Sequence, residues 1–150
     1  MIESFLRRAK NKLEEAEYNL NRLSYPESIS SSQESIEFSV KSLFLLYGVE
    51  YSKKHRFEEG EFVKVFGNAP KDVARIFLLS RFWSSFYTVA KYGYERLGIG
   101  AEYLFRREEA ELALKHAQEC YYGVHALKKQ REEELKIFNQ RQKNEENKAR

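Results

Sequence analysis

The sequence has one cysteine, two prolines and no long apolar run among its 150 residues. A single cysteine, Cys120, excludes an internal disulfide and agrees with a reducing compartment. No apolar run approaches the roughly 18 residues that indicate a membrane span. The N-terminus, MIESFLRRAK, also lacks the apolar core of a signal peptide. These absences predict a cytoplasmic protein without a membrane-spanning segment.

The scarcity of proline and glycine favours helices. Only seven glycines accompany the two prolines, while 42% of the residues are hydrophobic and 33% are charged. This composition is typical of a helix-rich globular protein, and it argues against a disordered or an all-β chain. A length of 150 residues is enough for one domain with its own core and too short for two ordinary domains.

The net charge of +3 comes from the C-terminal end of the chain. Residues 128–150 carry eight Lys or Arg side chains against five Glu, so residues 1–127 are formally neutral. Domains that bind duplex nucleic acid usually carry a strong basic surface. The charge distribution therefore does not favour RNA or DNA as a partner.

Apolar and small residues are spaced four and three apart near the N-terminus, which predicts a helix over residues 2–23 that ends before Pro26. In the serine-rich stretch that follows, five serines keep the same spacing: Ser28, Ser32, Ser35, Ser39 and Ser42. A linker has no reason to keep helical phase. The pattern predicts a central helix whose small face lets a neighbouring backbone approach closely, and whose end is set by Gly48 in the left-handed conformation.

The sequence after residue 48 predicts further helices. Residues 49–70 are irregular, with one short helix around residues 59–66. A helix begins at Pro70 and ends at the glycines 93, 98 and 100, and its buried face includes Tyr87 and Tyr94. A last helix extends past residue 127. We expect an all-α fold, an antiparallel up-and-down bundle of four to five helices with a long C-terminal helix. Residues 1–127 form the bundle, and residues 128–150 form a charged helical extension that is frayed or disordered at its end.

The stretch SSQESIEFSVKSLFLLYGVEYSKKHRF carries a Glu followed four residues later by a Lys, an apolar run, a glycine and a later histidine. These are Glu37, Lys41, residues 43–47, Gly48 and His55, and in this arrangement the sequence resembles the HEPN family over residues 1–127. The resemblance implies a helical bundle, usually a homodimer. It also implies a minimal nucleotidyltransferase as partner in a toxin–antitoxin-like pair, and a nucleotide as ligand.

Some members of that family are metal-independent ribonucleases, whose signature is an Arg followed by a His after four to six intervening residues. None of the three histidines, His55, His116 and His125, has an Arg at the required positions. We therefore predict no catalytic residue and a non-catalytic protein. Two alternatives stay open: a ribonuclease toxin with a displaced pair, in which Arg96 or Arg107 meets His116, and a plain protein-assembly module.

Three groups of residues are candidates for ligand binding. Glu37 and Lys41 form either a solvated helix ion pair or a partly buried contact under a groove or at a dimer interface. Lys53, Lys54 and His55 lie in the basic run KKHR, which suits a phosphate. Tyr92 and Arg96, with Lys91, combine an aromatic face with cations, as a nucleotide requires. His116 and Cys120 share a helix face, but two ligands are too few for a structural metal site. We expect no metal and no cofactor.

Overall fold

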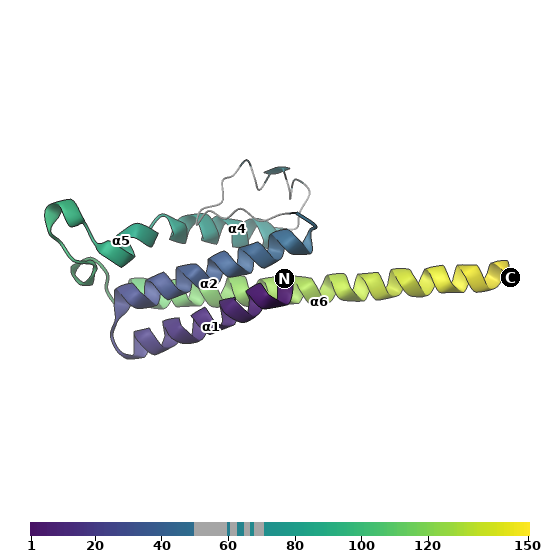
Figure 1. Cartoon of the computed structure of the whole chain (residues 1–150), viewed down its shortest axis with the longest axis horizontal. Coiled ribbons are helices and arrows are strands. Elements are labelled where there is room, and N and C mark those ends of the chain that lie inside the picture. Colours follow the sequence, from purple (N-terminus) through teal and green to yellow (C-terminus); the bar gives the residue numbers. More distant parts are fainter. Residues whose placement is uncertain (50–59, 61–62, 65–66, 68–70) are drawn as a thin grey trace.

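The computed structural model describes residues 1–49, 60, 63, 64, 67 and 71–150, and these residues form helices joined by loops (Figure 1). The chain order is α1 (Ile2–Asn21), α2 (Tyr25–Leu46), α4 (Lys71–Ser84), α5 (Tyr87–Tyr92), the short 3-10 helices η1 (Glu95–Leu97) and η2 (Ala101–Tyr103), and α6 (Arg107–Ala149). Within this part of the chain the only β-type pairing is one isolated bridge, between Tyr94 and Ile99. The predicted all-α fold is confirmed.

The two N-terminal helices are antiparallel, and the serines of α2 line their contact. Three serine hydroxyls donate to backbone carbonyls of α1: Ser28 to Ala16 and Ser35 to Ala9, both at 2.8 Å, and Ser42 to Ile2 at 3.2 Å. The three donors are seven residues apart on α2, and their acceptors are seven residues apart on α1. The predicted close approach of a neighbouring backbone to the serine face is therefore confirmed.

The end of α2 follows the predicted glycine stop. Gly48 has a φ of 76°, and its N–H donates to the carbonyl of Leu45. The N–H of Val49 donates to the carbonyl of Phe44 at 3.0 Å. This pair of hydrogen bonds satisfies carbonyls at the end of the helix, which a left-handed residue makes possible. Leu23 takes the equivalent left-handed position after α1, with a φ of 63°.

The helix predicted from Pro70 to the later glycines is instead divided into α4 and α5. Two consecutive serines stand at the break: Ser84 donates to the carbonyl of Arg81, and Ser85 to the carbonyl of Phe82. Serine hydroxyls that bind nearby carbonyls compete with the helical hydrogen bonds, which favours the turn. Because the helix turns here, the predicted phase is lost, and Tyr94 is 49% exposed. Its prediction as a buried residue was wrong.

α6 packs against the other helices with its first half and extends beyond them with its second half (Figure 1). The buried residues of α6 all lie between Ala110 and Val124. Residues 128–149 continue the helix, with Leu135, Ile137 and Phe138 exposed by 54–61%. The division of the chain at residue 127, and the fraying of its end, stay predictions. No helix in the described ranges is long and apolar enough to cross a membrane.

Candidate functional site

Glu37 and Lys41 form an ion pair of 2.9 Å on α2, and their side chains are only 6% and 11% exposed. The ammonium group of Lys41 also lies 5.5 Å from the ring centroid of Phe38. The solvated alternative for this pair is therefore wrong, because both groups are almost entirely removed from water. Removing one member of a buried ion pair is usually strongly destabilising, whereas the pair as a whole contributes little net stability.

A second polar cluster joins three helices close to this pair. Glu34 of α2 accepts ion pairs from Lys12 of α1 at 3.1 Å and from Lys91 of α5 at 3.5 Å. Lys91 also lies 4.7 Å from the ring centroid of Tyr87, and its hydrogen bond to Tyr87 raises the pKa of Lys91, with the charge of Glu34 adding to the effect. Glu34 of α2 therefore joins α1 on one side and α5 on the other. The sequence pattern did not reveal Lys12 and Glu34, because their contact is tertiary.

Tyr92 and Arg96 come together at the end of α5, where they line a pocket of about 480 Å³. Gly93, Tyr94 and Glu95 also belong to its lining. The loop is closed by two hydrogen bonds between the backbones of Tyr94 and Ile99, at 2.8 and 3.2 Å. Tyr92 is 58% exposed, so much of its side chain is accessible to a ligand. Two of the predicted ligand-binding residues thus share one cavity.

Gly93 makes this loop possible. Its φ is 66° and its ψ is −156°, a combination that residues other than glycine hardly adopt. A Cβ atom here would overlap the carbonyl oxygen of Ile99 and lie 2.8 Å from the backbone nitrogen of Ala101. The close approach of the two loop arms therefore depends on the absence of a side chain.

We expect Gly93→Ala to lower the free energy of unfolding by roughly 3 kcal/mol, through backbone strain and steric overlap. Gly98→Ala is a matched control, because Gly98 has the same φ of 66° but open space around its Cβ position. That variant should cost only about 1 kcal/mol. Chemical denaturation of both variants measures the difference, and equal losses would show that the loop arms separate easily.

His116 of α6 is held by a tryptophan. The indole N–H of Trp83 donates to Nδ1 of His116 at 2.9 Å. Burial lowers the pKa of His116, and the positive charge of Arg75 lowers it further. The imidazole is therefore a neutral acceptor in this contact.

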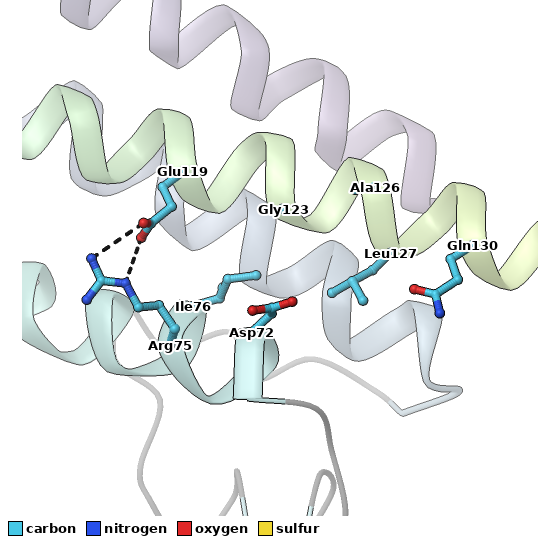
Figure 2. A pocket seen from close by; sticks show the side chains of 8 residues that line it. All are labelled: Asp72, Arg75, Ile76, Glu119, Gly123, Ala126, Leu127 and Gln130. Carbon is cyan, nitrogen blue, oxygen red and sulfur yellow. Dashed lines mark hydrogen bonds and ion pairs between the residues drawn. The ribbon is translucent and has the colours of Figure 1, made fainter.

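Arg75 of α4 is itself engaged, since its guanidinium binds both carboxylate oxygens of Glu119 at 3.0 and 3.4 Å (Figure 2). These two residues line a pocket of about 300 Å³ between α4 and α6, with Ile76, Gly123 and Leu127 among its apolar members. A Cβ atom at Gly123 would lie 3.1 Å from Cδ1 of Ile76, so this glycine lets the two helices approach closely.

The arginine near His116 is thus Arg75, and not Arg96 or Arg107. Arg107 pairs with Glu111 at 3.3 Å and stands nine residues before His116, a rise of ~13.5 Å along the helix. Arg96 lies in the loop beyond α5, within the pocket beside Tyr92. A pattern of local spacing could not identify Arg75, because its proximity to His116 depends on how α4 packs on α6.

The remaining predicted site residues are those of the basic run KKHR, and Cys120 is the cysteine that we considered as a metal ligand. Lys53, Lys54 and His55, like the predicted short helix around residues 59–66, fall outside the residues that the structure describes. Cys120 is buried, and its burial raises the pKa of the thiol well above the usual range. No group of three or more metal-ligating side chains occurs among the described residues.

Comparisons with known proteins agree with this bundle. Among solved structures, the chain is similar to the crystal structure of TT1696 from Thermus thermophilus, with a TM-score of 0.65 and 22% identity. The match covers 83% of this chain and 96% of the other, and at this identity it indicates a shared fold. No protein of curated function matches significantly. The HEPN domain model matches residues 2–126, which include the buried Glu37–Lys41 pair, and the chain therefore belongs to the HEPN domain family.

Proposed function

We propose that this chain is a non-catalytic HEPN bundle that acts as a binding module. It self-associates, and it binds a nucleotide or a minimal nucleotidyltransferase in a toxin–antitoxin-like pair. The proposal of a nucleotide ligand rests on the pocket that Tyr92 and Arg96 both line. An aromatic ring stacks on a base, and a guanidinium group binds phosphate oxygens through two parallel hydrogen bonds. Glu95 belongs to the same lining, and a carboxylate can accept hydrogen bonds from ribose hydroxyls.

The hydrogen bond between His116 and Trp83 is an argument against ribonuclease activity. A ribonuclease that works without metal needs a His to move a proton and a nearby cation to stabilise the developing charge. Nδ1 of His116 already accepts the Trp83 N–H, and the neighbouring Arg75 is neutralised by Glu119. The ribonuclease alternative would have to break both contacts, so we favour a binding role.

Self-association and a protein partner are supported by apolar side chains on the outer surface of α4. Leu78 and Phe82 are 59% and 46% exposed, although α4 already buries five apolar side chains on its inner side. Exposed large apolar patches are typical of protein-binding surfaces. The plain assembly module, without a nucleotide, is the version of this proposal that remains if the ligand test fails.

A thermal shift experiment with ATP tests the ligand. We expect millimolar ATP to raise the melting temperature, by roughly 5–10 °C if its concentration is 100-fold above Kd. Arg96→Ala should abolish the shift, because it removes the phosphate-binding group. Arg7→Ala, which removes an equal charge from the exposed surface of α1, should retain it. An unchanged melting temperature with millimolar ATP would contradict nucleotide binding.

A further inference from the structure

The outer surface of α4 differs from the outer surfaces of its neighbours. On α1, most exposed positions carry charged side chains, such as Arg7, Lys10 and Glu14. On α4, Ala74, Leu78 and Phe82 are exposed and stand four residues apart, so they form one ridge along the helix. Val73, Ile76, Phe77, Leu79 and Trp83 fill the opposite, buried side. Lys71, Asp72 and Arg75 are also exposed, but the ridge gives α4 apolar side chains on both sides, which is typical of a helix covered on both sides.

Phe82 is positioned by the aromatic core beneath it. Its ring centroid lies 5.1 Å from that of Trp83 and 5.4 Å from that of Phe86, both in edge-to-face arrangements. Trp83 is in turn fixed by its hydrogen bond to His116. The exposed ring therefore rests on the buried Trp83 and the partly buried Phe86, as the rigid aromatic anchors of protein interfaces do.

The apolar surface continues onto α6, which runs antiparallel to α4. Arg75 of α4 binds Glu119 of α6 across their outer edge (Figure 2). Phe82 stands seven residues after Arg75, and Leu112 stands seven residues before Glu119. Because the two helices are antiparallel, both steps lead in the same direction from the ion pair, by about two helical turns or ~10.5 Å. Leu112 is 42% exposed and so lies on the same side as Phe82. We call Ala74, Leu78, Phe82 and Leu112 the α4–α6 face.

The α4–α6 face is complementary to itself. Along its ridge the side chains increase in size from Ala74 to Leu78 to Phe82. When two such helices meet antiparallel around a two-fold axis at Leu78, each Phe82 lies over the small Ala74 of the other copy, and the two leucines meet. An isologous interface needs this kind of self-match.

The charge at the edge of the face is also compatible with a second copy. Arg75 and Glu119 neutralise each other at 3.0 Å, so two copies do not meet with like net charges at this edge. A nucleic acid would instead require an excess of cations. An apolar centre beside a neutralised polar edge is the usual anatomy of a protein–protein interface.

We propose that the α4–α6 face is the self-association surface, and that its partner is a second copy of this chain related by a two-fold axis near Leu78. This inference rests on the self-association proposed above. It adds which residues meet: Leu78 with Leu78 of the partner copy, and Phe82 with Ala74 of the partner copy.

Scattering mass and thiol cross-linking test this arrangement on the full chain. At micromolar concentration the wild type should show twice the chain mass of 17.8 kDa. Phe82→Glu should halve that mass while circular dichroism stays helical, because it places a charge against the apolar surface of the partner copy. Tyr122→Glu is the matched control, since Tyr122 is 57% exposed on α6 and lies outside the face. That variant should stay dimeric.

Leu78→Cys adds an independent measurement. Cys120 is buried, so the introduced thiol is the exposed one, and oxidation should link two copies through residue 78. Tyr122→Cys should not be linked under the same conditions. If the wild type is a dimer, Phe82→Glu stays dimeric and Leu78→Cys is not cross-linked, the proposed surface is wrong and self-association still holds. A monomeric wild type would overturn both.

Discussion

Lys41→Met should lower the free energy of unfolding by about 3 kcal/mol, toward the lower end of the range for breaking a buried ion pair. The variant leaves the carboxylate of Glu37 in a place where only 6% of its side chain is exposed, without the ammonium group now 2.9 Å away. For a chain of 150 residues this corresponds to a fall in melting temperature of roughly 6–12 °C. Thermal and chemical denaturation at one protein concentration measure the loss.

The double variant Glu37→Leu with Lys41→Met separates the lost attraction from the cost of a buried carboxylate left without Lys41. Replacing both members of a buried pair by apolar residues of similar size is often neutral or stabilising, so the double variant should recover most of the loss. Arg107→Met is the control, since it breaks another pair four residues apart, whose side chains are about half exposed. It should cost only about 0.5 kcal/mol.

The outcome decides the role of the residues that carry the family resemblance. A large loss in the single variant, recovered in the double one, assigns the pair to packing of α2. A single variant as stable as the wild type would instead show that the pair contributes nothing to the fold, and would return Glu37 and Lys41 to the candidates for ligand binding.

Ser35→Leu should also lower the free energy of unfolding, by up to about 4 kcal/mol, through overpacking and a lost hydrogen bond. Ser35 is fully buried, and its hydroxyl lies 2.8 Å from the carbonyl oxygen of Ala9 on the neighbouring helix. A leucine cannot fit unless α1 and α2 move apart, which would also disturb the hydrogen bonds of Ser28 and Ser42 to α1.

Ser35→Ala separates size from hydrogen bonding at the same position. It removes the hydroxyl and keeps the small volume, so it should cost only about 1 kcal/mol. Urea denaturation of the wild type and both variants gives the two losses. If leucine and alanine proved equally tolerated, the close approach of α1 and α2 would not depend on the small serines.

Several features followed from the sequence because they depend on positions within one helix. The serine stripe keeps the phase of 3.6 residues per turn, so it predicted that one face of α2 is small whatever packs on it. Gly48 ended α2 as predicted, because the left-handed residue and the two hydrogen bonds after it are local. Tyr92 and Arg96 belong to different elements, α5 and η1, but only three residues separate them along the chain, so their proximity is also local.

Which residues of different helices become neighbours was decided by the tertiary structure alone. The spacing of Glu37 and Lys41 is the same for a solvated and a buried pair, and only the packing around α2 removes both groups from water. Arg75 lies close to His116, and Phe82 and Leu112 lie along one edge, because α4 runs antiparallel against α6 at Gly123. Periodicity fixes the direction of a side chain around its own helix axis. It carries no information about the neighbour across the interface, which depends on loop paths and on the complementary volumes of residues far apart in the sequence.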